Sequence, residues 1–189
     1  MTAEEDRQRI MGFNIMSDYP VVSSGITFQE VPGKVAVYFE LGNCQQGCDG
    51  CHSPHLAKCT ETKGFHEIFK HAEEKIDSGA NCILLMGGTT NNIPHESLVY
   101  LINGLSRLAP TALYSGRDDV EADLQLALNT GLSYIKTGSY KKELGGLDKP
   151  TTNQKFFKKE YLISHTYSEA RADAYMEDIT RESFQSCTN

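Results

Sequence analysis

The stretch N-C-Q-Q-G-C-D-G-C-H, at residues 43–52, holds three of the six cysteines in this chain of 189 residues. It places Cys44, Cys48 and Cys51 at the spacing C-x3-C-x2-C, directly after a hydrophobic run at residues 35–41. The run is rich in β-branched and aromatic residues and stops at a glycine, so it predicts a buried strand. We therefore expect the cysteines on a loop at the carboxyl end of that strand, where three thiols can bind a metal.

The spacing of these thiols favours an open iron–sulfur site over a closed zinc site. Structural zinc is held by four ligands in paired spacings, and the chain has no second Cys or His pair of that form. A [4Fe–4S] cluster is ordinarily held by four thiolates, so three cysteines leave one iron free for a substrate or cofactor. Zinc binding and redox-active thiols are alternatives at this point. His52 and His55 are expected beside the cysteines without ligating the metal.

The other three cysteines do not share this loop. Cys82 opens a hydrophobic run and is expected to be a small buried residue. Cys59 lies eight residues beyond Cys51, and Cys187 lies in the polar tail, where a free thiol is expected. The predicted protein ligands of the cluster are therefore the three cysteines of the loop alone.

Composition narrows the class of protein. The chain is 39% hydrophobic and 23% charged, which fits one globular domain with a substantial core. Its formal net charge of −7 and the lack of a basic cluster disfavour extended contact with nucleic acid, which depends on neutralising phosphates. The sequence shows neither a signal peptide nor an apolar stretch of membrane-spanning length. We therefore expect a cytoplasmic protein with reduced thiols, no disulfides and no membrane contact.

Hydrophobic runs alternate with amphipathic segments along the chain. The expected strands are residues 35–41, 81–86, 111–114 and 133–137, and the expected helices are residues 65–78, 98–105 and 120–128. Strands that alternate with helices of this length indicate right-handed βαβ units around a parallel sheet, with ligands at the carboxyl ends of the strands. Since only about four to six such units fit, the α/β fold is predicted to be a partial (β/α) barrel.

The predicted organisation is one domain with two terminal additions. Residues 1–25 are polar and mixed and are expected to form an N-terminal arm. Residues 26–160 form the core domain, and residues 161–189 form a C-terminal extension with a helical tendency. The chain has no internal repeat and no linker rich in Pro, Gly and Ser that would divide it further.

Two further motifs follow later strands of the predicted sheet. Gly87-Gly88 ends the second strand, and Ser115-Gly116-Arg117 ends the third. Either motif is also compatible with an ordinary turn. Beside a cysteine loop, however, two glycines let the backbone approach a ligand closely, and their main-chain groups can bond to it. The chain lacks a P-loop and a nucleophile elbow, which disfavours nucleotidase and hydrolase functions.

The cysteine spacing resembles the signature of the radical S-adenosylmethionine (SAM) superfamily, in which C-x3-C-x2-C lies on a loop after the first barrel strand. This resemblance implies a partial barrel of the radical SAM type. It also implies that Cys44, Cys48 and Cys51 ligate a [4Fe–4S] cluster whose fourth iron binds the amino and carboxylate groups of SAM. The residues implied to contact SAM are Gly87, Gly88, Thr89, Ser115 and Gly116. Thr89-Thr90 stands where the superfamily often has Glu-Pro.

Other segments resemble the small activating enzymes of anaerobic ribonucleotide reductase. The similarity covers residues 26–154 and includes C-D-G-C-H at 48–52, Q-E-V-P-G at 29–33, Y-S-G at 114–116 and T-N-Q at 152–154. The chain differs from those enzymes at Ser53, at Lys136 and in its extension beyond residue 154. Together the motifs indicate this family more specifically than the cysteine loop does alone.

The family resemblance implies an enzyme that generates a glycyl radical. An unidentified one-electron donor reduces the cluster, SAM splits into methionine and a 5′-deoxyadenosyl radical, and that radical takes a hydrogen from a glycine of the reductase large subunit. Thr152, Asn153 and Gln154 are predicted to form the docking loop for this partner.

Two alternative functions share the cysteine loop. One is another radical SAM enzyme, either an activase of a different glycyl radical enzyme or a small-molecule enzyme of the queuosine pathway type. The other is a non-enzymatic metal-binding or electron-transfer module. Binding of SAM to the reconstituted protein distinguishes an enzyme from such a module.

Overall fold

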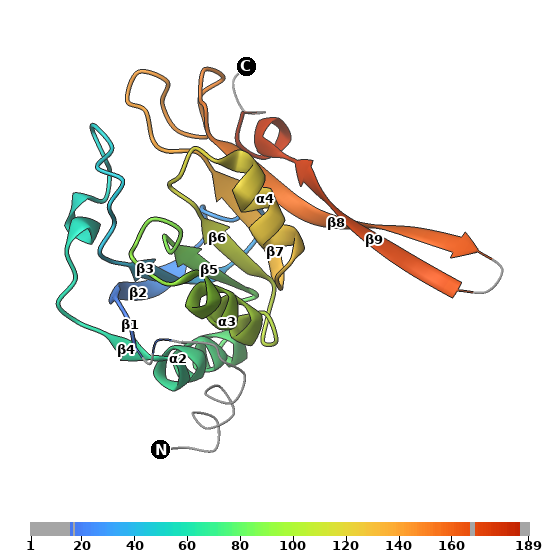
Figure 1. Ribbon diagram of the computed structural model, residues 1–189, viewed down its shortest axis with the longest axis horizontal. Helices are drawn as coiled ribbons and strands as arrows, with labels where there is room; N and C mark the ends of the chain where they lie inside the picture. The colour runs from blue at the N-terminus through green and yellow to red at the C-terminus, as the bar shows by residue number, and fades with distance from the viewer. Residues whose placement is uncertain (1–15, 17, 167–168, 186–189) are drawn as a thin grey trace.

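The computed structural model describes residues 16, 18–166 and 169–185. Its main feature is a mixed sheet of seven strands (Figure 1). In spatial order the strands are β2 (Val21–Thr27), β3 (Ala36–Leu41), β5 (Cys82–Met86), β6 (Thr111–Tyr114), β7 (Leu132–Thr137), β8 (Lys155–Thr166) and β9 (Glu169–Asp178). Strands β3, β5, β6 and β7 are parallel, whereas β2 and the β8-β9 hairpin pair antiparallel at the two sides. Two short strands, β1 (Asp18–Tyr19) and β4 (Lys63–Gly64), pair separately.

The alternation of parallel strands with helices confirms the predicted α/β class. The connecting helices are α2 (Phe65–Asp77), α3 (His95–Leu105) and α4 (Val120–Leu128), and two single turns are η1 (Pro54–Ala57) and η2 (Arg181–Gln185). Each predicted strand and helix lies close to its expected bounds. In the described residues the parallel region has four strands joined by three helices, which is fewer than the four to six βα units expected. The seven-stranded sheet is open and does not close into a barrel.

Local sequence explains where the helices begin and end. The Asp119 side chain caps α4 by accepting a hydrogen bond from the backbone N of Ala122 at 3.0 Å. Two acidic residues in the first turn, Glu121 and Asp123, add a favourable interaction with the helix dipole. Helix α2 ends just before Gly79, whose φ of +110° continues the chain in a conformation that other residues rarely adopt.

Alternate residues along each strand face the two sides of the sheet and form two cores. On one side, Phe39, Leu85 and Leu113 pack with buried residues of α2, α3 and α4. On the other side, Leu84 and Phe156 belong to a smaller core with residues outside the three helices. The three helices therefore cover one face of the sheet, and the carboxyl edge of its parallel strands is left for loops (Figure 1).

The prediction of a helical C-terminal extension at residues 161–189 was wrong for most of its length. Strand β8 runs through residue 160 without a break, and β9 pairs with it from Phe157↔Asp178 to Thr166↔Glu169. The hairpin extends beyond the rest of the sheet (Figure 1). Helix propensity is a weak preference, and here antiparallel pairing between β8 and β9 along the hairpin prevails over it. Only η2 is helical in the described part of this extension.

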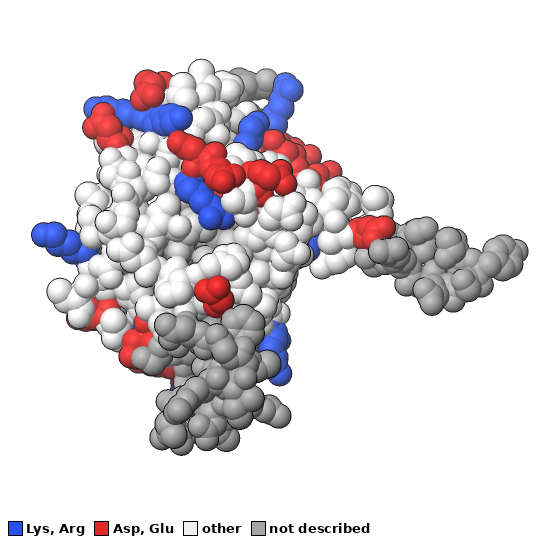
Figure 2. Space-filling view, in the orientation of Figure 1, with Lys and Arg blue, Asp and Glu red and all other residues white. Residues whose placement is uncertain are grey.

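The N-terminal arm predicted for residues 1–25 also differs from the structure where it is described. Val21 begins β2, which pairs with β3, so residues 21–25 belong to the sheet. Residues 1–15 and 17 lie outside the described residues. On the face shown in Figure 2, acidic and basic side chains are interspersed. Of the helices in the described part of the chain, none is both long and apolar enough to cross a membrane.

Candidate cluster and cofactor site

The predicted site residues meet at one edge of the sheet. Because β3, β5, β6 and β7 are parallel, their carboxyl ends share an edge, and the cysteine loop, Gly87-Gly88 and Ser115 follow β3, β5 and β6 in turn. The backbone N of Gln45, in the cysteine loop, donates to the backbone oxygen of Thr90 at 2.8 Å. The loop after β3 and the segment after β5 are therefore in direct contact.

Backbone conformation and hydrogen bonds shape the cysteine loop. Asn43 and Gly50 have φ values of +61° and +67°, in the left-handed region that glycine and asparagine tolerate best. The Asn43 side-chain Oδ1 accepts from the backbone N of Cys59 at 3.0 Å, which joins the two ends of the loop. The backbone N of Cys51 donates to the oxygen of Cys48 at 3.2 Å, so a turn separates these two cysteines.

The three predicted ligands are free thiols with different exposure. Cys44 and Cys48 are half-buried and Cys51 is exposed. The Sγ atom of Cys44 lies 3.7 Å from Thr90 Oγ1, and Cys51 Sγ accepts from the backbone N of Ser53 at 3.4 Å. Among the described residues, no three His, Cys, Asp or Glu side chains surround a common metal position. Three free thiols on one loop are the ligand type that an iron–sulfur cluster requires. In the conformation described here, however, the loop does not bring the three sulfur atoms around one point.

The remaining described cysteines have structural environments. Cys82 is fully buried in β5, as predicted, and burial raises the pKa of its thiol to about 11. Cys59 is half-buried, and its Sγ donates to the backbone oxygen of Glu61 at 2.8 Å. Cys187 lies outside the described residues.

Both histidines near the loop have other contacts. The His52 ring lies against the Tyr140 ring, with centroids 4.7 Å apart. The Nε2 atom of His55 lies 3.3 Å from Glu40 Oε2. These contacts hold the two imidazoles beside the loop.

The glycine pair after β5 forms a tight turn that requires glycine. Gly87 and Gly88 have φ values of +102° and +118°, and a Cβ atom would lie 2.9 Å from Asn91 Oδ1 at Gly87 and 2.8 Å from Leu98 Cδ1 at Gly88. The backbone N of Gly87 donates to Tyr114 O at 3.0 Å, and that of Gly88 donates to Asn91 Oδ1 at 2.6 Å. Both N–H groups are thus occupied, so the carbonyl oxygens of the turn are the groups that can bond a ligand, and they suit a donor such as an ammonium group.

A polar network follows β6. The hydroxyls of Thr89 and Ser115 lie 2.8 Å apart, and Ser115 Oγ accepts from the backbone N of Arg117 at 3.3 Å. The Arg117 side-chain Nε lies 2.6 Å from Oδ1 of Asp123, whose side chain is fully buried, and burial raises the pKa of that carboxyl. Arg117 is therefore paired rather than freely solvated. A Cβ at Gly116 would lie 3.5 Å from Thr90 Oγ1, so this residue also borders the segment after β5.

Lys136 adds an amine to this edge of the sheet. It is half-buried near the end of β7, with its Nζ 5.5 Å from the centroid of the Tyr114 ring. Burial lowers its pKa to about 8, although the thiolate forms of Cys48 and Cys51 and the carboxylate of Glu30 favour the charged amine. The sequence comparison identified Lys136 only as a difference from the activating enzymes, although a lysine near the end of a predicted buried strand also signals a place at this edge.

The three predicted docking residues hydrogen-bond to the loop that follows β7. The Thr152 hydroxyl donates to Gly145 O at 3.1 Å, and Asn153 Nδ2 donates to Ser139 O at 2.9 Å. Gln154 is only 5% exposed and donates to the backbone oxygen of Gly138. Gln154 therefore supports the chain and does not belong to an exposed docking surface, while Thr152 and Asn153 are half-buried.

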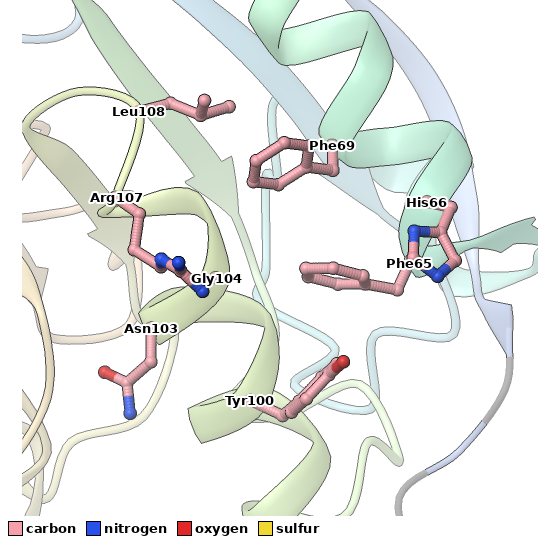
Figure 3. Close-up of a pocket in the computed structure, with 8 residues that line it drawn as sticks. All are labelled: Phe65, His66, Phe69, Tyr100, Asn103, Gly104, Arg107 and Leu108. Atoms are coloured by element: carbon pink, nitrogen blue, oxygen red, sulfur yellow. The ribbon is translucent and has the colours of Figure 1, made fainter. Parts of the chain in front are cut away.

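A separate hollow lies between α2 and α3, with a volume of about 600 Å³ (Figure 3). Its lining residues are Phe65, His66, Phe69, Tyr100, Asn103, Gly104, Arg107 and Leu108. The ring centroids of two of these lining residues, Phe65 and Tyr100, lie 4.8 Å apart. None of the predicted site residues lines this hollow.

Comparisons of this chain with protein-family models, with curated proteins and with solved structures found no match. The assignment of a function therefore depends on the motifs and on the geometry of the site.

Proposed function

We propose that this chain is a radical SAM activase that generates the glycyl radical of an anaerobic ribonucleoside-triphosphate reductase. The observation that carries the proposal is the C-x3-C-x2-C loop at the carboxyl end of β3, next to a glycine pair at the end of the adjacent parallel strand β5. Parallel α/β sheets bind their ligands at this edge. In this proposal the four parallel strands and their helices correspond to part of the partial (β/α) barrel of radical SAM enzymes.

Cys44, Cys48 and Cys51 would hold a [4Fe–4S] cluster. All three are free, and at least one face of the loop is open because Cys51 is exposed. The amine of Lys136 lies at the same edge of the sheet and interacts electrostatically with Cys48 and Cys51. When bound, the cluster supplies the electron that cleaves SAM reductively.

The segments after β5 and β6 would bind SAM. The carbonyl oxygens of Gly87 and Gly88 can accept hydrogen bonds from the amino group of its methionine moiety, since the N–H groups of both residues are already bonded. The paired hydroxyls of Thr89 and Ser115 can bond to its polar groups, and Gly116 allows close approach of the backbone. These residues orient the cofactor.

The open edge of the sheet suits a protein substrate. The glycine loop of the reductase large subunit would reach the exposed cysteine loop and complete the enclosure of the site. Thr152 and Asn153, which pack against the loop after β7, would lie at the rim of this contact. An unidentified one-electron donor is also required.

Anaerobic reconstitution with iron and sulfide tests the proposal. The protein is expected to bind four irons in a cluster whose electron paramagnetic resonance spectrum changes when SAM is added. Cys48→Ala should lose the cluster, and Cys59→Ala, which removes a thiol of similar exposure bonded to Glu61, is the matched control that should keep it.

The activase assignment requires a second measurement. The reduced protein with SAM should produce a doublet glycyl radical signal in the anaerobic reductase from the same source. Robust cleavage of SAM without a radical on that reductase would contradict the activase assignment and favour another radical SAM enzyme. A cluster that does not respond to SAM would favour an electron-transfer module.

A further inference from the structure

Asn91 joins the two loops that the proposed function uses. Its side chain is 2% exposed, and Nδ2 donates to the backbone oxygens of Leu41 at 2.6 Å and Gly42 at 3.0 Å, directly before the cysteine loop. Its Oδ1 accepts from the backbone N of Gly88 at 2.6 Å. The amide thus bonds the end of β3 on one side and the glycine turn after β5 on the other.

The chemistry of these contacts requires an asparagine. Two carbonyl oxygens on one side need two donors, and a peptide N–H on the other side needs an acceptor, so only one orientation of the amide satisfies all three. An aspartate of the same shape has no donor for the oxygens of Leu41 and Gly42. A glutamine has one more methylene group than the buried space next to Gly87 accommodates, because Asn91 already limits the room for a Cβ there to 2.9 Å.

The buried link differs from the other bond between these loops. The bond from the Gln45 backbone N to the Thr90 oxygen holds the loops together at their surface. It does not determine which way the Gly88 peptide faces. Asn91 does determine it, because its buried Oδ1 accepts from the Gly88 N–H and so fixes that N–H toward the interior. The carbonyl oxygens of the turn take no part in this bond.

We propose that Asn91 is a positioning residue that sets the orientation of the glycine turn relative to the cysteine loop, so that ligands bound at the two segments meet in a defined geometry. The identity of the ligand at the turn, SAM, rests on the proposed function. The mechanical coupling of the loops does not, since it follows from hydrogen bonds within the chain.

Two substitutions separate the two halves of this link. Asn91→Ala removes all three hydrogen bonds, whereas Asn91→Asp keeps an acceptor for Gly88 and loses both donors to the end of β3. Asn92→Gly is the matched control, because Asn92 is an exposed neighbour whose φ of +54° glycine adopts readily.

Amide hydrogen exchange of Gly88 in the cluster-free protein measures the link directly. Asn91→Ala is expected to raise the exchange rate of Gly88 about tenfold or more, because a buried donor loses its acceptor. Asn91→Asp and Asn92→Gly should leave this rate near that of the wild type. An unchanged Gly88 exchange rate in Asn91→Ala would overturn the inference whether or not the protein binds SAM.

Calorimetric SAM binding to the reconstituted protein tests the consequence for the site. Both Asn91 variants should bind SAM about tenfold more weakly at unchanged iron content, and Asn92→Gly should bind it normally. Gly79→Ala is expected to lose stability through backbone strain at a φ of +110°, at a position just after α2. It should also bind SAM normally, which separates positioning from loss of stability. Equal SAM affinity in wild type and Asn91→Asp would overturn the role of the β3 contacts. Failure of the wild type to bind SAM would instead contradict the proposed function. The exchange rate of the Gly88 amide would still test whether Asn91 couples the two loops.

Discussion

Replacing Gly87 with alanine is expected to destabilise the protein more than replacing Gly79. The two glycines have nearly the same φ, +102° and +110°. Each alanine would therefore occupy a backbone region that costs an L residue about 1–2 kcal/mol. Their surroundings differ, because a Cβ at Gly79 meets nothing within 4 Å, while one at Gly87 lies 2.9 Å from Asn91 Oδ1.

The Asn91 side chain cannot yield to the new methyl group at small cost. It is held by three hydrogen bonds of 2.6–3.0 Å in a buried position. Displacing it leaves buried polar groups without partners, which costs about 1–3 kcal/mol beyond the backbone strain. We therefore expect Gly87→Ala to lose about 2–5 kcal/mol of unfolding free energy in total, and Gly79→Ala to lose only the strain.

Urea unfolding of the cluster-free protein under reducing conditions, followed by circular dichroism, measures both losses. Similar slopes with different midpoints would show that the two variants differ in stability alone. Equal midpoints for Gly87→Ala and Gly79→Ala would contradict this prediction, since they would mean that Asn91 moves aside without cost.

Two further predictions concern Lys136 and Gly104. Burial lowers the pKa of Lys136 from 10.5 to about 8 in the folded protein. Between pH 8 and pH 10.5 the unfolded chain therefore binds more protons than the folded one. The cost of burying the charged lysine thus falls as the pH rises through this range. Lys136→Met should therefore be more stable than wild type at pH 7, by a margin that shrinks toward pH 10 in denaturant titrations; a constant margin would contradict the assignment. At Gly104 a Cβ would lie 2.4 Å from the Phe65 ring (Figure 3), and the resulting overpacking of about 1–3 kcal/mol should exceed the helix-propensity gain of about 1 kcal/mol. Gly104→Ala should thus unfold at a lower temperature, and a raised midpoint would mean that the ring swings into the hollow.

Features encoded within short windows of sequence could be predicted. The four parallel strands and three helices follow from hydrophobic periodicity and from glycine stops, which need no knowledge of distant residues. Burial of Cys82 followed in the same way from its place in an apolar run. Parallel connections then place the cysteine loop and Gly87-Gly88 at one edge of the sheet, as predicted.

Features that depend on partners far along the chain were decided by the tertiary structure. Asn91 bonds Leu41, 50 residues away, and no local pattern distinguishes it from the exposed Asn92 beside it. The C-terminal segment has helical propensity, but pairing of β9 with β8 makes it a hairpin. Gln154, predicted at a docking surface, is buried, and its side-chain amide donates to the backbone oxygen of Gly138. Local sequence determines the type of an element, whereas burial and long-range hydrogen bonds determine which polar side chains become part of the framework and which are left to bind a ligand.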